Sequence, residues 1–119
     1  MSLDRMIEKI AQLQNPTVAG LDPKLSYIPE YIREKALKEH GKTLEAAAAA
    51  VLEYNRGLID ALCGIVPAVK PQAAYYEAFG WQGVKVLAET IAYAKEKGMF
   101  VITDGKRNDI GTTMEAYAA

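Results

Sequence analysis

Phe100-Val-Ile-Thr-Asp-Gly-Lys-Arg-Asn-Asp-Ile-Gly-Thr-Thr113 is the stretch that decides the fold. It begins as a run of apolar and β-branched residues typical of a buried strand, and it continues directly into charged side chains. If the strand geometry persists, Asp104 and Lys106 share one face of the strand. Opposite charges at the end of a buried strand are costly unless they are paired or used. The stretch therefore predicts a carboxylate and an ammonium at the carboxyl end of a strand, where α/β proteins usually place their chemistry.

The composition is that of an ordinary globular chain. Its 119 residues are 50% hydrophobic and 24% charged, with a formal net charge of −1, and this length suffices for one hydrophobic core. The lack of a basic excess predicts no nucleic-acid surface, and no apolar run approaches the roughly 20 residues of a membrane helix. Cys63 is the single cysteine, which excludes an internal disulfide and fits a reducing cytoplasm.

The hydrophobic pattern predicts alternating helices and strands. Helical spacing of apolar residues predicts helices over 3–14, from Pro29 to about His40, over 44–62 with Thr43 as its cap, and over 81–97. Continuous apolar runs predict strands over 17–22, 65–70 and 99–103, after which Thr112 or Thr113 can cap a further helix. Strands separated by helices indicate a parallel sheet with right-handed crossovers. Pro67 indicates that the second strand pairs irregularly or begins near the proline.

All three predicted strands end in a charged residue, namely Asp22, Lys70 and Asp104. A doubly wound sheet also satisfies the order of elements, but a ring of charged residues at the carboxyl mouth favours a TIM (β/α)8 barrel. Such a barrel takes about 250 residues. We therefore expect residues 1–119 to supply about the first three βα units, as the N-terminal portion of a single barrel domain, with the remainder of the barrel missing or in a separate chain.

Three motifs resemble one enzyme family in order and spacing over essentially the whole sequence. Asp-Gly-Lys-Arg-Asn-Asp-Ile-Gly-Thr-Thr, residues 104–113, closely resembles the Asp-x-Lys-x-x-Asp signature of orotidine 5′-phosphate decarboxylases, in their bacterial type 2 branch. Val-Ala-Gly-Leu-Asp-Pro, residues 18–23, and Ala-Val-Lys-Pro-Gln, residues 68–72, resemble the first and second strand ends of that family. The resemblance implies a ribulose-phosphate-binding barrel and a cytoplasmic homodimer with shared active sites. It also implies decarboxylation of orotidine 5′-monophosphate to uridine 5′-monophosphate, the last step of pyrimidine synthesis, without metal or cofactor.

The resemblance assigns the chemical step to Lys106, Asp104 and Lys70. It implies that Lys106 protonates C6 of the pyrimidine, that Asp104 faces the substrate's carboxylate, and that Lys70 bridges Asp104 and a ribose hydroxyl. The physical chemistry of these side chains fits, because loss of CO2 from C6 leaves a poorly delocalised carbanion. An ammonium beside C6 stabilises this charge as it develops and then supplies the proton. A carboxylate beside the departing carboxylate disfavours the bound ground state.

The resemblance assigns substrate binding to further residues. Asp22 would contact the ribose, whereas Asp109 and Thr113 would reach across a dimer interface to the ribose in the partner's site. The sequence contains no His/Cys cluster and no dinucleotide fingerprint, so we expect no metal and no cofactor. For Arg107 and Asn108 two roles stay open, either in the substrate site or in the dimer interface. The sequence does not identify phosphate-binding residues or a lid.

Other interpretations of the same residues stay open. A related sugar-phosphate barrel enzyme, such as the Mg-dependent hexulose-phosphate synthase or ketogulonate-phosphate decarboxylase, shares part of the signature. A non-catalytic half-barrel that needs a partner chain is a further possibility, and the charges would then form a structural network. For Tyr75, Tyr76, Phe79 and Trp81 we expect packing in the lid of a βα loop. Nothing in the sequence ranks Gln72 or Asn55 above other polar residues.

Overall fold

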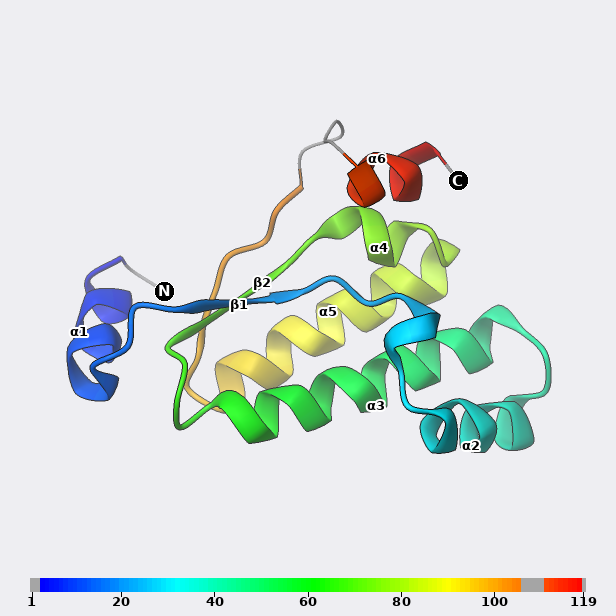
Figure 1. Ribbon diagram of the computed structural model, residues 1–119, viewed down its shortest axis with the longest axis horizontal. Coiled ribbons are helices and arrows are strands. Elements are labelled where there is room, and N and C mark those ends of the chain that lie inside the picture. The colour runs from blue at the N-terminus through cyan, green and yellow to red at the C-terminus, as the bar shows by residue number, and fades with distance from the viewer. Residues whose placement is uncertain (1–2, 106–110, 119) are drawn as a thin grey trace.

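The structure, a computed structural model, describes residues 3–105 and 111–118, apart from the side chains of Met114 and Tyr117. In chain order the elements are α1 (Leu3–Leu13), β1 (Val18–Leu21), the 3-10 helix η1 (Leu25–Tyr27), α2 (Glu30–His40), α3 (Leu44–Leu62), β2 (Ala68–Pro71), α4 (Ala73–Glu77), α5 (Gly80–Glu96), β3 (Phe100–Val101) and α6 (Gly111–Ala118) (Figure 1). The four predicted helices α1, α2, α3 and α5 are confirmed to within one residue at each end.

The strands form one parallel sheet with β2 in the centre, in the order β1-β2-β3. β1 pairs with β2 from Val18 opposite Ala68 to Leu21 opposite Pro71, and Ala68 lies opposite Phe100 of β3. Each connection between neighbouring strands carries helices, as Figure 1 shows. The predicted parallel α/β arrangement of about three βα units is therefore confirmed.

The strands are shorter than the apolar runs from which they were predicted. β2 begins at Ala68 rather than Ile65, and Pro67 lies just before the first paired residue. Proline has no N–H to donate to the sheet, but its carbonyl accepts a hydrogen bond from Phe100 N at 2.9 Å. β3 contains only Phe100 and Val101, although its hydrogen bonds to β2 continue further, with Ile102 N donating to the carbonyl of residue 69 at 3.0 Å.

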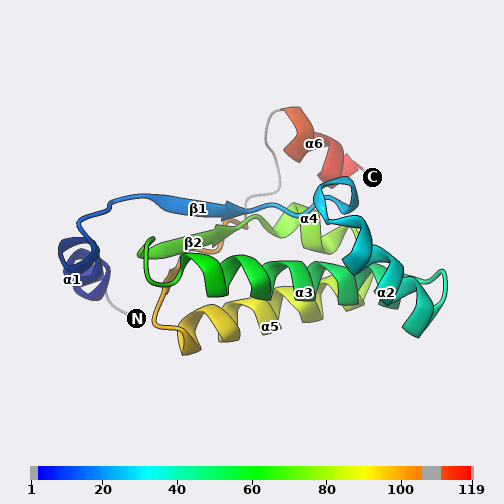
Figure 2. The same cartoon turned by 60° about the horizontal axis from the view of Figure 1, so that its bottom comes forward.

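The helices α3 and α5 cover one face of the sheet (Figure 2). Leu21 and Val69 point to this face and are buried with Ile59 of α3 and with Ala94 and Met99 at the end of α5. A second apolar cluster lies between α2, α3 and α4 and includes the alanine run of α3. As predicted, Thr43 caps α3, and its Oγ1 accepts a hydrogen bond from the backbone N of residue 46 at 3.2 Å.

Two predictions about the loops after the strands need correction. The five-residue helix α4 follows β2 immediately, and no helical periodicity predicts it because the segment is too short to repeat. Helix α6 begins at Gly111, so Thr112 and Thr113 lie inside its first turn and do not cap it. Their hydroxyl groups contact the side chain of Tyr75 instead.

Candidate active site

The carboxyl ends of the strands place Asp22 and Asp104 at one level of the sheet, with Lys70 two residues before that level. The register places Gly20 opposite Lys70, so two residues further along Asp22 is level with Gln72. Gln72 in turn forms a parallel bridge with Asp104. Side chains alternate along a strand, and the odd-numbered neighbours of these residues face the helices. The even-numbered side chains therefore lie on the opposite face of the sheet and converge there. One detail differs from the prediction, since Lys70 lies within β2 and Pro71 ends the strand.

Lys70 and Asp104 form an ion pair on the face of the sheet opposite the helices. Lys70 Nζ lies 3.9 Å from Asp104 Oδ2, and the two side chains are 45% and 18% exposed. The main chain of Asp104 is held on both sides, because its N–H donates to Pro71 O at 3.0 Å and its carbonyl accepts from Ala73 N at 2.9 Å. The backbone that carries this carboxylate is therefore held by the end of β2, whereas the lysine is a long, half-exposed side chain that can adjust.

Asp22 follows β1 and lines a cleft of about 220 Å3. Other residues around the cleft include Gly20, Tyr27, Tyr54 and Asn55. The Asp22 side chain is exposed, and the preceding residue, Leu21, is buried. This places a carboxylate at the rim of the same sheet end as the ion pair, with an open space beside it. The arrangement suits recognition of a polar ligand that carries hydroxyl groups.

A buried polar network lies directly beneath this end of β1. Tyr76 of α4 donates its hydroxyl hydrogen to Leu21 O at 2.9 Å. Asn55 of α3 donates from Nδ2 to Tyr76 Oη at 3.0 Å and to Thr90 Oγ1 of α5 at 3.1 Å. Burial raises the pKa of the Tyr76 hydroxyl well above its ordinary value, and the nearby charge of Asp22 acts in the same direction, although the Asn55 hydrogen bond lowers it. The hydroxyl is therefore a neutral donor.

Sequence reasoning missed the role of Asn55 and anticipated only the burial of Tyr76. A signal for Asn55 exists, because it lies four residues after Val51 and four before Ile59, both buried in the apolar stripe of α3. A polar residue at a core position must find hydrogen-bond partners. For Tyr76 the sequence offers no comparable signal, because its helix is too short for a periodic pattern.

Tyr75 connects α4 to α6. Its Oη lies 3.0 Å from Thr112 Oγ1 and 3.2 Å from Thr113 Oγ1. Thr113 is the residue for which the family resemblance implies contact with the partner's ribose. Here its hydroxyl is 3.2 Å from that of Tyr75 in the same chain, and this contact joins the first turn of α6 to α4. Figure 1 shows α4 and α6 next to each other at the carboxyl ends of the strands.

The other predicted residues of the charged array, Lys106 and Asp109, lie outside the described residues, as do Arg107 and Asn108. In residues 3–105 and 111–118, no three His, Cys, Asp or Glu side chains are grouped so as to hold a metal ion. No helix in this part of the chain has the length and apolar character needed to cross a bilayer.

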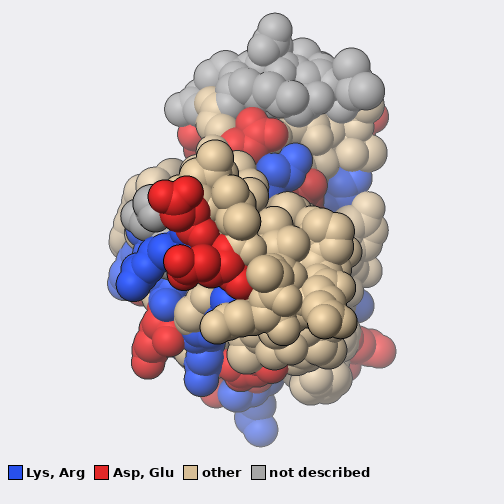
Figure 3. Space-filling model, turned by 90° about the vertical axis from the view of Figure 1, so that its left-hand side faces the viewer, with Lys and Arg blue, Asp and Glu red and all other residues tan. Residues whose placement is uncertain are grey.

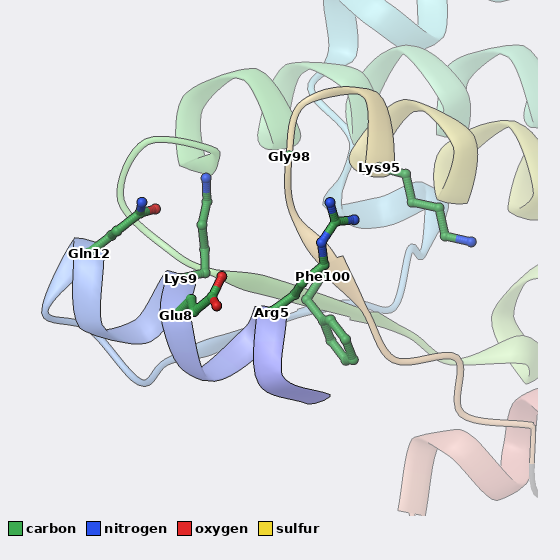
Figure 4. Close-up of a pocket in the computed structure, with 7 residues that line it drawn as sticks. All are labelled: Arg5, Glu8, Lys9, Gln12, Lys95, Gly98 and Phe100. Carbon is green, nitrogen blue, oxygen red and sulfur yellow. The ribbon is translucent and has the colours of Figure 1, made fainter. Parts of the chain in front are cut away.

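A larger cavity, of about 350 Å3, lies at the opposite end of the sheet. It is lined by side chains of α1, the last turn of α5 and the start of β3 (Figure 4): Arg5, Glu8, Lys9, Gln12, Lys95, Gly98 and Phe100. This end of the molecule carries acidic and basic side chains close to one another (Figure 3). In barrel enzymes the amino ends of the strands serve stability rather than chemistry. We therefore place the candidate site at the carboxyl ends.

Comparisons with known proteins identify the family. A sequence model of the family described as "Orotidine 5'-phosphate decarboxylase / HUMPS family" matches residues 52–119. An orotidine 5′-phosphate decarboxylase of Rhodopirellula baltica is 46% identical over 102 residues, which is 86% of this chain and 33% of the relative. The orotidine 5′-phosphate decarboxylase of Clostridium novyi is 40% identical over 116 residues, which is 98% of this chain and 37% of the relative. The chain thus spans about a third of the length of these curated relatives.

Solved structures give the same result for the fold. A Streptomyces avermitilis protein, described as an orotidine 5′-phosphate decarboxylase, superimposes with a TM-score of 0.65 at 35% identity, covering 99% of this chain and 39% of that one. A Toxoplasma gondii protein described as an orotidine-monophosphate decarboxylase gives a TM-score of 0.68 at 25% identity, covering 97% and 34%. The family has the TIM barrel fold, so the predicted fold class is confirmed.

Proposed function

Because the chain belongs to the orotidine 5′-phosphate decarboxylase / HUMPS family, we propose that the whole protein decarboxylates orotidine 5′-monophosphate to uridine 5′-monophosphate. The observation that carries this proposal is the Lys70–Asp104 ion pair, 3.9 Å between Nζ and Oδ2, at the same edge of the sheet as Asp22. A reaction that replaces a carboxylate by a carbanion and then by a C–H bond needs this combination of fixed negative charge and nearby ammonium groups.

In this proposal Asp104 faces the carboxylate of the substrate. Its main chain is held by Pro71 and Ala73, which limits how far the carboxylate can move away from that of the substrate. Lys70 forms an ion pair with Asp104 and reaches a ribose hydroxyl with its remaining donors. Asp22, at the rim of the neighbouring cleft, accepts a hydrogen bond from the ribose. Lys106, two residues after Asp104 in the motif, supplies the proton to C6 and compensates the developing charge.

The electrostatic terms alone do not account for catalysis by such an enzyme. Two unit charges 4 Å apart interact by about 4 kcal/mol at an effective dielectric constant near 20. Typical enzymes lower barriers by about 8–23 kcal/mol. The difference must come from binding energy that remote parts of the substrate supply, above all the phosphate and the ribose. We therefore assign phosphate binding to parts of the full-length protein other than the residues discussed here, and we expect residues 1–119 alone to be inactive.

We further propose that the protein is a homodimer in which Asp109 and Thr113 complete the partner's site. The support comes from the motif Asn-Asp-Ile-Gly-Thr-Thr, residues 108–113, and from α6, which carries Thr113 at the carboxyl ends of the strands. Residues 1–119 would then be the N-terminal portion of one barrel domain. The single, unpaired Cys63 supports a cytoplasmic location.

The experiment that tests the function is a decarboxylation assay on the full-length protein with orotidine 5′-monophosphate, in the presence and absence of EDTA. We expect turnover that EDTA does not reduce. The HUMPS branch of the family provides the competing outcome: turnover of a sugar phosphate that requires added Mg2+ and no turnover of the nucleotide. The relatives named above favour the decarboxylase, since each carries that name.

A further inference from the structure

The end of β1 receives a hydrogen bond from a side chain outside the sheet. Leu21, the last residue of β1, lies opposite Pro71 of β2. A hydroxyl group from another element donates to the Leu21 carbonyl: Tyr76 Oη lies 2.9 Å from Leu21 O. The Tyr76 side chain is fully buried, at 0% exposure. This hydrogen bond thus joins two residues that are 55 positions apart in the sequence, directly before Asp22.

The direction of the hydrogen bonds in this network follows from the groups involved. A backbone carbonyl accepts only, so the Tyr76 hydroxyl donates to Leu21 and presents its lone pairs to Asn55. Asn55 Nδ2 fills this acceptor position at 3.0 Å and donates its second hydrogen to Thr90 Oγ1 at 3.1 Å. Asn55 is fully buried, and within the described residues its Oδ1 has no hydrogen-bond partner. The buried Asn55 amide therefore acts through its two N–H donors, and the one that bonds to Tyr76 Oη orients the tyrosine hydroxyl.

The network connects three helices to one strand end. Asn55 belongs to α3, Tyr76 to α4 and Thr90 to α5, while the final acceptor is the carbonyl of β1 that precedes Asp22. Within the described sheet β1 pairs with β2 alone, and its first residue, Val18, is exposed. The buried Tyr76 hydroxyl donates to Leu21, the last residue of β1, and therefore helps to fix the direction of the Asp22 side chain that follows.

We propose that Tyr76, oriented by Asn55, is a positioning residue that holds Asp22 in place for substrate binding. The proposal rests on the proposed function, because it gives Asp22 the role of a ribose ligand. Tyr76 itself touches neither substrate nor reacting atoms. Its effect is exerted through Leu21, and the loss of its hydroxyl releases the end of β1 while Asp104 and Lys70 keep their places on β2 and beyond.

The test is Tyr76→Phe in the full-length protein, with Thr90→Val as the matched control. Both changes remove one hydroxyl group from the same buried network, but only the first touches β1. A net hydrogen bond corresponds to a factor of roughly 2–12, so we expect the KM of Tyr76→Phe for orotidine 5′-monophosphate to rise about tenfold, with kcat changed less than KM. Thr90→Val should stay within about twofold of the wild type in both constants.

A double-mutant cycle with Asp22→Ala separates positioning from general loosening of the core. If Tyr76 acts through Asp22, Tyr76→Phe costs little further kcat/KM once Asp22 is gone. Equal losses in both backgrounds overturn the proposal, as does a Tyr76→Phe enzyme with wild-type KM. If Tyr76→Phe does not fold, Asn55→Ser serves in its place, because it removes the amide that orients the hydroxyl and keeps the tyrosine.

A second readout is independent of activity. Hydrogen exchange in the peptide that covers residues 18–23 should become faster in Tyr76→Phe and stay unchanged in Thr90→Val, because only the former frees the end of β1. Unchanged exchange in both variants overturns the proposed anchoring even if the enzyme is active. Absence of nucleotide decarboxylation in the wild type, with faster exchange in Tyr76→Phe, refutes the function but keeps the anchoring of β1.

Discussion

Gly83 of α5 packs directly against the backbone of Tyr76: a Cβ built on Gly83 would lie 1.9 Å from Tyr76 O. No side chain fits there without moving α4 away from α5. Overpacking of this kind costs about 1–3 kcal/mol, and we expect at least that loss in the free energy of unfolding for Gly83→Ala. Chemical denaturation of the full-length protein measures it.

Gly57 of α3 provides the control for this substitution. A Cβ at Gly57 meets nothing within 4 Å, and the residue is an exposed position inside a helix. Alanine in a helix is favoured over glycine by about 0.8–1.0 kcal/mol, so Gly57→Ala should stabilise the protein. If both substitutions change stability by the same amount and sign, close packing of α4 on α5 is not the reason for a glycine at position 83.

Lys70→Ala should greatly reduce kcat/KM and hardly change stability. The Lys70–Asp104 pair is 3.9 Å long with a half-exposed lysine, and exposed ion pairs contribute only about 0–1 kcal/mol to folding. Lys85→Ala is a matched control, since Lys85 Nζ also lies 3.9 Å from its partner, Glu89. It should leave kcat/KM unchanged. A Lys70→Ala enzyme with normal turnover but reduced melting temperature would mean that the pair is structural.

The buried hydroxyl of Tyr76 predicts a loss of stability at alkaline pH. Its pKa in the folded state is raised above the ordinary value of 10.0, chiefly because burial disfavours the phenolate. Above about pH 10 the unfolded chain releases this proton while the folded chain retains it, so the free energy of unfolding falls as pH rises. Below that pH the contribution is fully present.

Urea unfolding between pH 8 and pH 11 checks this prediction. The free energy of unfolding should fall less with pH in Tyr76→Phe than in the wild type. Only this change with pH is compared, because the two proteins also differ in stability by an amount that does not depend on pH. Tyr75→Phe is the comparison, because it removes the neighbouring hydroxyl, which bonds to Thr112 and Thr113. An identical pH dependence in wild type and Tyr76→Phe contradicts the prediction.

Lys106→Ala should abolish turnover in a folded full-length protein. General acid catalysis alone contributes about 10²–10⁴-fold, and the ammonium also stabilises the carbanion, so we expect a loss of kcat at or beyond this range. Steady-state kinetics and circular dichroism together measure it. Near-normal turnover would remove Lys106 from the role of proton donor.

Asp109→Ala should weaken substrate binding through the partner subunit. If the sites are shared between subunits, mixing Asp109→Ala with Lys106→Ala protein produces heterodimers in which one site has both residues intact. Part of the activity should then return, up to about a quarter of the wild type for random mixing. Verified heterodimers without any recovery would contradict a shared site.

The sequence predicts the helices and strands in which apolar residues recur at regular spacing. It does not predict the segments whose structure depends on particular hydrogen bonds. α3 and α5 are long enough to display an apolar stripe, and the three strand ends were recognisable from a charge after an apolar run. α4 spans five residues and is placed by contacts of Tyr75 and Tyr76 with distant segments. Such contacts follow from the tertiary fold and leave no local pattern.

The same distinction holds for the candidate site. The sequence predicts that Asp22, Lys70 and Asp104 lie at the same edge of the sheet. The register places Asp22 and Asp104 level with Gln72, and Lys70 two residues before that level. The roles of these residues, and those of Lys106, Asp109 and Thr113, stay predictions. The supporting network was not foreseen, because an asparagine in a helix and a tyrosine after a strand each have many possible partners. Their hydrogen bonds become apparent only when α3, α4 and α5 are packed on the sheet.

The two hydrogen bonds that hold the main chain of Asp104 imply an unequal mechanical response in the ion pair. The backbone of Asp104 is held at its N–H and its C=O, and one methylene group separates its carboxylate from that backbone, whereas four methylene groups separate the Lys70 ammonium from its own. When an anion approaches, the lysine therefore has more freedom to move than the carboxylate. The carboxylate of the substrate then meets a negative charge with a short range of movement, and loss of CO2 is the change that relieves the repulsion.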